Sequence, residues 1–351
     1  MRLGIGLPTT IKGVRGAQLT EWSRRAEAAG FDSLATMDGL AFPNYEPLVA
    51  LGAAAAVTER IELITAITIL PYRQNAALVA KQAATLHDLS GGRLSFGIAI
   101  GGAAADYAAS GVPWEERGRR FERMVEEIRR VWAGKARDGA EPVGPDVSAT
   151  PPRLLIGGAA DVAFERAARH GDGWIMAGGP PAVFSEGREK LDAAFRAAGR
   201  TQRPRALAGG YFALGKDAEG QARRGLGEYF AAQPDVAELS IAGAFTDPGM
   251  VREALDESSA VAVTTSSCSP RRPSRSRSIS SRAPAASPTP PARSPAAPGR
   301  PSWSGRPRSG GRPDRGDSSG SRLRGPAAAS GTRLHASSNP RTPPGCPRRG
   351  Y

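Results

Sequence analysis

Seven short apolar runs alternate with amphipathic segments along the first 256 residues, and this alternation constrains the fold more than any other feature of the sequence. The runs are rich in Ile, Leu and Val, as is typical of buried strands. They lie at Leu3–Leu7, Ser33–Met37, Ile61–Leu70, Leu94–Ile100, Leu154–Ile156, Trp174–Ala177 and Ala206–Leu214. Because parallel strands need helical crossovers, seven such units predict an α/β fold with a parallel sheet.

The segments between the runs carry the helical period. In one of them six apolar residues form a single stripe, with Glu and Arg on the opposite face. The stripe consists of Phe121, Met124, Val125, Ile128, Val131 and Trp132. The first helical segment ends at Gly30, a residue that suits a helix C-terminus.

An open doubly wound sheet and a closed barrel both satisfy this alternation. About 250 residues and seven units favour a TIM (β/α)8-barrel that lacks its last unit. Gly4 and Gly6 lie inside the first strand rather than in a turn before a helix, so the dinucleotide-binding fingerprint is absent. We therefore predict a TIM-barrel domain over residues 1–256 with the eighth β/α unit missing.

The last part of the chain has a different composition. Residues 257–351 contain 17 Arg, no Lys and three acidic residues, a net charge of +14, whereas residues 1–256 carry a net charge of −1. Pro, Ser, Ala and Gly dominate this tail, and such a segment cannot bury enough apolar surface to offset its ordering entropy. We predict that residues 257–351 form a disordered C-terminal tail.

An Arg-rich disordered tail can bind RNA or DNA through phosphates. A nucleic-acid-binding protein is therefore the alternative function. The tail has no Lys, and Trp303 and Tyr351 are its only aromatic residues. We expect nothing beyond non-specific charge binding from it.

A second explanation of the tail is that it is an out-of-frame translation from about Ser258 onward. It lacks Lys, Phe, Met and Gln and abounds in residues with G/C-rich codons, as expected when GC-rich DNA is translated in the wrong frame. One codon choice for residues 257–281, translated from its third base, encodes the strand-like segment DDLVLFP. This frameshift hypothesis predicts unpaired edges on the first and seventh strands, low stability, aggregation and weak or no activity.

Cysteine and histidine usage excludes several classes of site. Cys268 and Cys346 both lie in the tail, so residues 1–256 can form no disulfide and no Cys-based metal site. The three histidines, His87, His170 and His335, form no cluster and no HExxH motif, and we predict no metal. With no signal-peptide stretch and no apolar run of membrane-spanning length, we expect a soluble cytoplasmic protein without a membrane partner. The sequence leaves open whether the chain forms a homodimer.

In a barrel the active site lies at the C-terminal ends of the strands. Asp38 follows the second strand, where a carboxylate can hydrogen-bond a polar ligand or relay a proton, and it is the candidate catalytic residue. Thr65 is a polar position in the third strand, and Gly101 after the fourth permits close approach of a ligand to the backbone. A helix cap, ordinary strand filling and a simple turn are the structural alternatives for these positions.

The best local signal for a ligand follows the fifth strand. Gly157, Gly158 and Ala159 precede a helix that starts near Asp161, and free N–H groups at a helix N-terminus favour a phosphate. Gly178, after the sixth strand, can close the same pocket. A cofactor that carries its own redox chemistry fits a site this poor in nucleophiles and acid–base groups.

Several motifs, taken together, resemble the bacterial luciferase-like monooxygenase family. They are Glu27–Leu34 followed by Asp38, Pro47–Leu51 leading into Val57–Ile61, Ala80–Leu86 with Leu89–Leu94, Gly111–Pro113 with Glu116 and Arg117, and Ala167–Trp174. The resemblance covers residues 1–256 almost continuously. It implies a flavin-dependent oxidoreductase on a (β/α)8-barrel, which binds FMN or the deazaflavin coenzyme F420 and acts on a small organic substrate, with or without oxygen.

The resemblance also implies roles for individual residues. Asp38, Thr65 and Ala66 would face the flavin ring, with Gly101 nearby, and Gly157–Ala159 would hold the phosphate. The chain departs from the family in two places. Many deazaflavin-dependent members carry His after the strand-two Asp, where this chain has Gly39, and the segment between residues 135 and 152, often a longer insertion over the site, is short here.

Overall fold

The short apolar runs form a ring of parallel strands in the computed structural model, which describes residues 2–137, 140–178, 181–257 and 261–263. The strands of the ring are β1 (Leu3–Gly6), β2 (Ser33–Thr36), β3 (Glu62–Thr65), β5 (Leu94–Ala99), β6 (Arg153–Gly157), β7 (Gly173–Ala177), β8 (Arg205–Gly210) and β9 (Val261–Val263). They pair in the order β3-β2-β1-β9-β8-β7-β6-β5, and β5 pairs with β3 to close the ring. The predicted TIM barrel is confirmed, and the open sheet is excluded.

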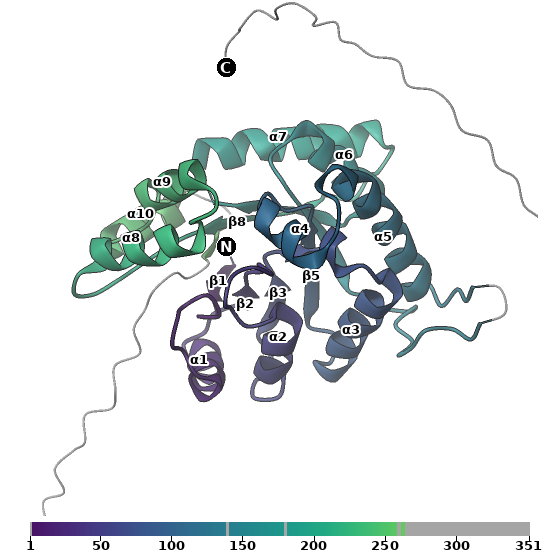
Figure 1. Cartoon of the computed structure of the whole chain (residues 1–351), viewed down its shortest axis with the longest axis horizontal. Coiled ribbons are helices and arrows are strands. Elements are labelled where there is room, and N and C mark those ends of the chain that lie inside the picture. The colour runs from purple at the N-terminus through teal and green to yellow at the C-terminus, as the bar shows by residue number, and fades with distance from the viewer. Residues whose placement is uncertain (1, 138–139, 179–180, 258–260, 264–351) are drawn as a thin grey trace, which may run out of the picture. The chain divides into compact units, whose positions relative to one another are not determined.

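Helices surround the ring (Figure 1). They are α1 (Gly16–Ala28), α2 (Pro47–Ala55), α3 (Ala76–Leu89), α4 (Ala104–Ser110), α5 (Arg117–Trp132), α6 (Asp161–His170), α7 (Pro181–Ala197), α8 (Ala218–Tyr229), α9 (Pro234–Ala242) and α10 (Pro248–Glu257), with single 3-10 turns η1 (Pro71–Arg73) and η2 (Trp114–Glu116). The six residues of the predicted apolar stripe are the buried residues of α5. Gly30 follows the end of α1 with φ +83°, as expected for a glycine at that position.

The predicted third strand, Ile61–Leu70, is divided in two. A cis peptide bond joins Ala66 and Ile67, and beyond it the chain forms a separate short strand, β4 (Thr68–Ile69). β3 pairs with the beginning of β5, and β4 pairs with its end. The prediction of one continuous strand was therefore wrong, because its apolar composition does not reveal the break.

Two apolar cores lie on the two sides of the strands. The inner core fills the barrel and contains Ala35, Ile64, Ile67, Ala99, Leu155 and Ile175. The larger outer core lies between the strands and the helices and includes Leu34, Leu63, Phe96, Ile128 and Trp174. This alternation along each strand is what a filled barrel requires.

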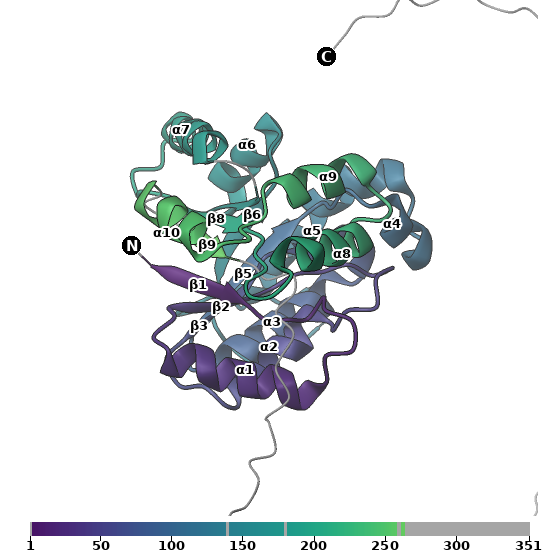
Figure 2. The same cartoon turned by 90° about the vertical axis from the view of Figure 1, so that its left-hand side faces the viewer.

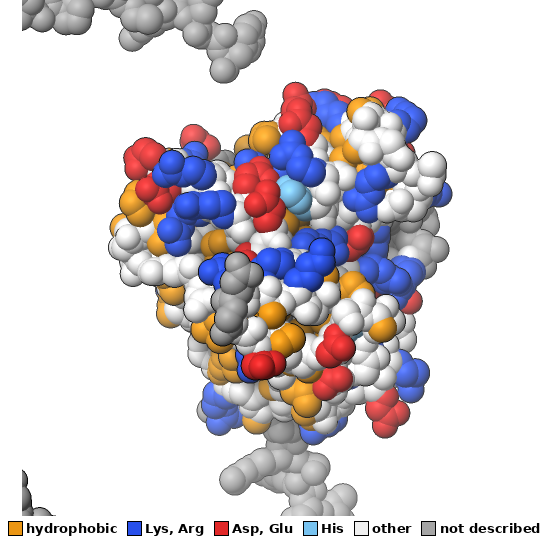
Figure 3. Space-filling model, turned by 90° about the vertical axis from the view of Figure 1, so that its right-hand side faces the viewer, with side chains coloured by type: hydrophobic (Ala, Val, Ile, Leu, Met, Phe, Trp, Pro, Cys, Tyr) orange, Lys and Arg blue, Asp and Glu red, His pale blue; other side chains and the backbone are white. Residues whose placement is uncertain are grey.

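The N-terminal end of the barrel is closed by an ion cluster around Glu62. Its carboxylate accepts hydrogen bonds from both terminal nitrogens of Arg205 and from the Ser95 hydroxyl, and Arg2 lies 3.2 Å away. Burial raises the pKa of Glu62, but the hydrogen bonds and charge of Arg205 hold it below its ordinary value. On the face that Figure 3 shows, acidic and basic side chains are interspersed. This agrees with the nearly neutral charge of residues 1–256.

The eighth strand position is occupied, contrary to expectation. β9 pairs with β1 on one side and with β8 on the other, so these two strands do not keep the unpaired edges that the frameshift hypothesis predicts. Three residues, Val261–Val263, are enough for this, and valine, which is two of the three, favours strands. Figure 2 looks onto this side, where β1 lies between α1 and α10 with no described helix in front of it.

The rest of the predicted tail, residues 258–260 and 264–351, lies outside the described residues. The frameshift hypothesis for those residues therefore stays a prediction. In the part of the chain that the structure describes, no helix is both long and apolar enough to span a membrane.

Candidate functional site

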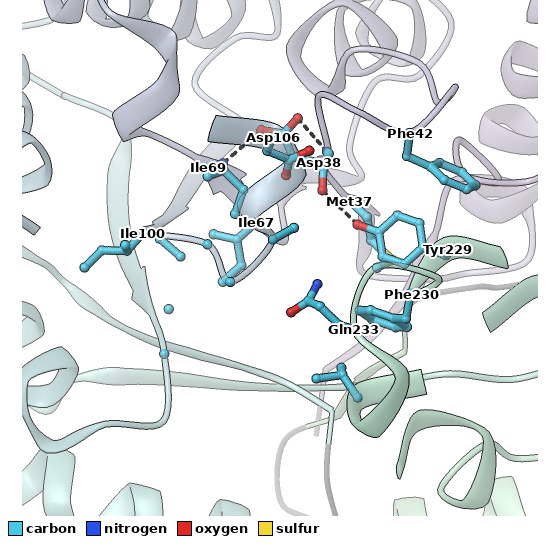
Figure 4. A pocket seen from close by; sticks show the side chains of 18 of the residues that line it. Met37, Asp38, Phe42, Ile67, Ile69, Ile100, Asp106, Tyr229, Phe230 and Gln233 are labelled. Carbon is cyan, nitrogen blue, oxygen red and sulfur yellow. Dashed lines mark hydrogen bonds between the residues drawn. The ribbon is translucent and has the colours of Figure 1, made fainter. Parts of the chain in front are cut away.

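A cavity of about 690 Å³ lies at the C-terminal ends of the strands, where the sequence predicted a shared pocket. Residues at or after the ends of β2, β3, β5 and β6 form one part of its lining. The segment that joins α8 to α9, residues 228–236, forms much of the rest. Figure 4 shows that the two parts face each other across the cavity.

One wall of the cavity consists of small residues. They are Ala66, Ala99, Gly101, Gly157, Gly158, Ala159 and Ala160. Contacts with two other lining residues require the glycines: a Cβ on Gly157 would lie 1.9 Å from Ile67 Cδ1, and one on Gly101, whose φ is +81°, would lie 2.7 Å from Ile69 Cγ2. The wall thus leaves room for a flat ligand against the backbone.

The opposite wall is aromatic. The Phe42 and Tyr229 rings pack edge to face with centroids 5.1 Å apart, and Tyr229 contacts Phe230 in the same way at 4.8 Å. The Tyr229 hydroxyl donates a hydrogen bond of 2.8 Å to the Asp38 carbonyl. An ion pair of 2.9 Å between Lys12 and Glu228 is a second contact of this kind. The C-terminal end of α8 is therefore held against the segments that follow β1 and β2.

Asp38 lies at the end of β2 with both carboxylate oxygens engaged. One oxygen accepts hydrogen bonds of 2.8 Å from the Ile69 N–H and from Arg73, and the other accepts one of 3.0 Å from the Gly39 N–H. The side chain is only 4% exposed, and Arg73 also pairs with Glu46 at 2.9 Å. Asp38 therefore holds the end of β2, the start of β4 and η1 together.

A second carboxyl, that of Asp106 in α4, lines the same cavity. It accepts a hydrogen bond of 2.8 Å from the Ala41 N–H. Burial, and then the charge of Asp38, raise its pKa above the ordinary Asp value. Burial followed by the charge of Asp38 also raises the pKa of Tyr72, so this tyrosine keeps its proton. The site thus favours the protonated form of the Asp106 carboxyl.

The helix that follows the small wall begins where the sequence predicts, at Asp161. No side chain caps it, because the residue at the cap position is Ala160. Gly158 precedes it with φ +134°, a conformation that favours glycine. One turn further, Arg166 lines the cavity and donates a hydrogen bond of 2.6 Å from Nε to Glu122. Uncapped N–H groups with a nearby guanidinium fit a phosphate.

The structure brings most of the predicted site residues together. Asp38, Ala66, Gly101, Gly157, Gly158 and Ala159 line the large cavity. Thr65 does not, because its fully buried hydroxyl donates a hydrogen bond of 2.7 Å to the Gly97 carbonyl. Gly178 lines a neighbouring cavity of about 220 Å³, which shares Gly158 and Ala159 with the large one. Contact of these residues with a cofactor stays a prediction.

The sequence did not single out the residues of the aromatic wall, nor Asp106, Arg166 and Gln233. Two features of the sequence could have pointed to Asp106 and Gln233. Asp106 is the one acid in the small-residue run Ala103–Ala109, and Pro234 after Gln233 is typical of a helix start. The residues described from 135 to 152, the short segment noted above, contribute nothing to the cavity lining. Within the described ranges no group of three or more His, Cys, Asp or Glu side chains is arranged to hold a metal ion.

The sequence model of one family, described as luciferase-like monooxygenase, matches residues 1–272. An uncharacterized protein of Mycobacterium tuberculosis is 34% identical over 191 residues, which cover 45% of this chain and 65% of that protein. The F420-dependent glucose-6-phosphate dehydrogenase of Kribbella flavida is 28% identical over 221 residues, 56% of this chain and 66% of that enzyme. The chain thus spans just under two thirds of the length of these relatives.

Solved structures agree with the fold. The monooxygenase RslO1 from Streptomyces bottropensis superimposes with a TM-score of 0.61 at 24% identity, covering 76% of this chain and 92% of that chain. The coenzyme F420-dependent tetrahydromethanopterin reductase from Methanopyrus kandleri gives a TM-score of 0.59 at 19% identity, covering 76% and 93%. At these identities the likeness shows the shared barrel.

Proposed function

The chain belongs to the luciferase-like monooxygenase family, and on that premise we propose that it is an oxidoreductase that uses FMN or coenzyme F420 to oxidise or reduce a small organic substrate. The observation that carries the proposal is the cavity at the strand ends, with a wall of small residues on one side and aromatic side chains on the other. Family members are oxidoreductases, and two relatives are named as F420-dependent enzymes.

The small-residue wall is suited to hold such a cofactor. Ala66, Ala99 and Gly101 leave the space that a flat ring needs, and Gly157–Ala159 with Arg166 offer N–H donors and a positive charge to its phosphate. Asp161, in the first turn of α6, would repel a phosphate, but it is 80% exposed and Lys190 pairs with it at 3.1 Å. When bound, FMN or F420 supplies the hydride chemistry that these side chains lack.

The protein's own side chains then position the reactants and handle the proton. Asp38 has no free carboxylate oxygen, so its contribution is to fix the end of β2 beside the ring rather than to transfer a proton. Asp106 faces the cavity with a raised pKa, and it is the group that exchanges a proton with the substrate. Gly39 takes no part in that exchange, because it has no side chain.

A cofactor titration tests the proposal. Purified protein freed of cofactor is titrated with FMN and, separately, with F420, and the quenching of cofactor fluorescence gives each Kd. We expect one of the two to bind in the micromolar range. If neither binds below about 1 mM, roughly −4 kcal/mol of binding free energy, the proposal fails.

Oxygen use is measured on the same samples. The reduced cofactor–protein complex is mixed with air-saturated buffer, and oxygen uptake with substrate is compared with uptake without it. A monooxygenase consumes oxygen in step with substrate, whereas a dehydrogenase does not. Nucleic-acid binding through the tail concerns residues outside the described ranges and stays an untested alternative.

A further inference from the structure

Gln233 places a free amide in the cavity between the two walls. It is half-buried, its side chain points into the space beside Phe230, and no described residue hydrogen-bonds to its amide (Figure 4). Its backbone is fixed, because its N–H donates to the Phe230 carbonyl at 2.7 Å and its carbonyl accepts from the Ala237 N–H at 3.0 Å. The amide is therefore held ready to donate or accept one hydrogen bond from a ligand.

Beside the proposed cofactor, the cavity offers no free cation to an anionic substrate. Of its lining residues, Lys12 and Arg166 are the cations. Lys12 pairs with Glu228 at 2.9 Å, and Arg166, which donates to Glu122 at 2.6 Å, is the cation assigned above to the cofactor phosphate. Asp106 has no cationic partner and adds repulsion whenever it is ionised. A negatively charged substrate would lose its hydration here without gaining a counter-charge.

The surroundings of the amide are apolar. Phe42, Tyr229 and Phe230 present rings to the same part of the cavity, and Val236 completes the lining beside them. An apolar body of a ligand is stabilised by packing against these rings. A polar group on that body then meets the Gln233 amide.

We propose that the substrate is a small uncharged molecule with an apolar body and one carbonyl or hydroxyl group, and that Gln233 selects it by a hydrogen bond to that group. This inference rests on the proposed oxidoreductase function and narrows it. The proposed substrate class differs from glucose 6-phosphate, the phosphorylated sugar for which two relatives of the chain are named. A pocket built around one polar partner discriminates strongly against ligands that leave that partner unpaired.

Four probes and three variants test the selection by ligand-observed NMR, with and without bound cofactor. The probes are cyclohexanone, cyclohexanol, cyclohexanecarboxylate and glucose 6-phosphate. We expect the two neutral ring compounds to bind and both anions to bind at least about tenfold more weakly. Gln233→Leu weakens the neutral pair about tenfold. Gln233→Lys restores binding of cyclohexanecarboxylate, because it supplies the missing cation.

Gln82→Leu makes the same chemical change on the exposed face of α3, away from the cavity, and leaves all four affinities as they are in the unchanged protein. The proposal is overturned if cyclohexanecarboxylate binds the unchanged protein as tightly as cyclohexanone does. It is overturned equally if Gln233→Leu behaves like Gln82→Leu. Cofactor titration of the same samples keeps the two hypotheses apart: bound cofactor without probe selectivity refutes this inference alone, and probe selectivity without cofactor binding refutes the oxidoreductase proposal alone.

Discussion

The two flanks of the barrel differ in how completely their strands are covered. On one flank every residue of β2, β3 and β5 is buried. On the other flank, beside β9, residues of β1 and β8 alternate between buried and half-buried. We call the first the closed flank and the second, which consists of β8, β9 and β1, the seam. Strand pairing is continuous through both, so pairing and covering are separate requirements of a barrel.

Local packing explains the difference. Strands of the closed flank share the large outer core with α2, α3 and α5. At the seam, Leu3 and Ile5 are only partly buried and pack on a small cluster with Phe212 and Phe245, although Ile5 also contacts the large outer core. Three residues of β9 supply the hydrogen bonds that close the ring, but the described chain places no helix outside them. A (β/α)8-barrel covers each strand with the helix that follows it.

The same division runs through the candidate site. The small-residue wall, proposed for the cofactor, lies at the ends of β3, β5 and β6, away from the seam. Tyr229 and Phe230 of the aromatic wall, and Gln233 beside them, come from the segment that follows β8, a strand of the seam. We therefore expect changes on the closed flank to affect folding and cofactor binding, and changes at the seam to affect solubility and substrate binding.

Covering the seam should produce the largest effect. The change is a chain whose residues 258–351 are replaced by the product of the restored reading frame, which would supply a strand in place of β9 and a helix after it. Burying the partly exposed Leu3 and Ile5 together with the apolar face of the new helix should raise the free energy of unfolding by about 5 kcal/mol. Urea unfolding measures the gain, and binding of a hydrophobic dye and light scattering should fall with it.

Sequencing the gene across codon 258 tests the frameshift hypothesis directly. A verified frame, together with a soluble, monodisperse and active protein as written, would refute the frameshift hypothesis. A control chain that simply ends at residue 263 separates the loss of the present tail from the gain of a new helix, since only the restored frame should stabilise the barrel.

A change at the closed flank should produce the next largest effect. A Cβ on Gly97 would lie 2.1 Å from the Thr65 carbonyl oxygen, a backbone atom that cannot move aside as a flexible side chain could. Gly97→Ala should therefore cost about 3 kcal/mol of stability. Gly52→Ala in α2 is the matched control, because nothing lies within 4 Å of its added Cβ and alanine favours a helix. Equal unfolding midpoints for the two variants would show that the closed flank is not tightly packed.

The sequence allowed prediction of what depends on local pattern. The α5 stripe and the start of α6 at Asp161 follow from helical spacing and from glycines before a helix, which are properties of neighbouring residues. The break at Ala66–Ile67 was missed because the run is uniformly apolar on both sides of it. β9 was missed because three residues carry no measurable period, and only the gap between β1 and β8 gives them a place.

The site was predictable to the same extent. Glycines and Asp38 at strand ends could be located because every strand end of a barrel meets the same face. Thr65 was assigned to the ring side, but the inward or outward direction of a side chain next to a strand break does not follow from alternation alone. Tyr229 and Gln233 approach the cavity through tertiary folding of α8 and α9, over a distance of about 190 residues from Asp38.

Cofactor binding on the closed flank gives the third test. Gly158→Glu places a negative charge before the uncapped start of α6, and φ +134° at this position disfavours any side chain. We expect the Kd of the bound cofactor to rise roughly a hundredfold through repulsion of its phosphate. Gly199→Glu, at another left-handed glycine with open space around it, is the control for the added charge and the backbone conformation. Unchanged affinity in Gly158→Glu would locate the phosphate elsewhere.

The smallest expected effect compares two carboxyls of the closed flank that have opposite pKa shifts. Burial first, and then Asp38, raise the pKa of Asp106, so the folded protein favours its protonated form. Hydrogen bonds from Arg130, and also from Arg137, hold the pKa of Glu127 at about 2, so the folded protein favours its ionised form. The stability that Asp106 contributes is present below its unfolded pKa, near 3.9, and is lost as pH rises through the folded value. The stability that Glu127 contributes is present above its unfolded pKa and is lost as pH falls towards about 2.

The two amide variants should therefore change stability in opposite directions near neutral pH. Asp106→Asn mimics the protonated form and can still accept from the Ala41 N–H, so it should raise the urea midpoint at about pH 7, and the gain should vanish near pH 4. Glu127→Gln should lower the midpoint at about pH 7, because it removes the acceptor charge that Arg130 and Arg137 pair with, and the loss should shrink as the solution is acidified. A loss of stability in Asp106→Asn at neutral pH would mean that its carboxyl is ionised and favourably paired in the folded protein, and Asp106 could then not serve as the proton-carrying group of the site.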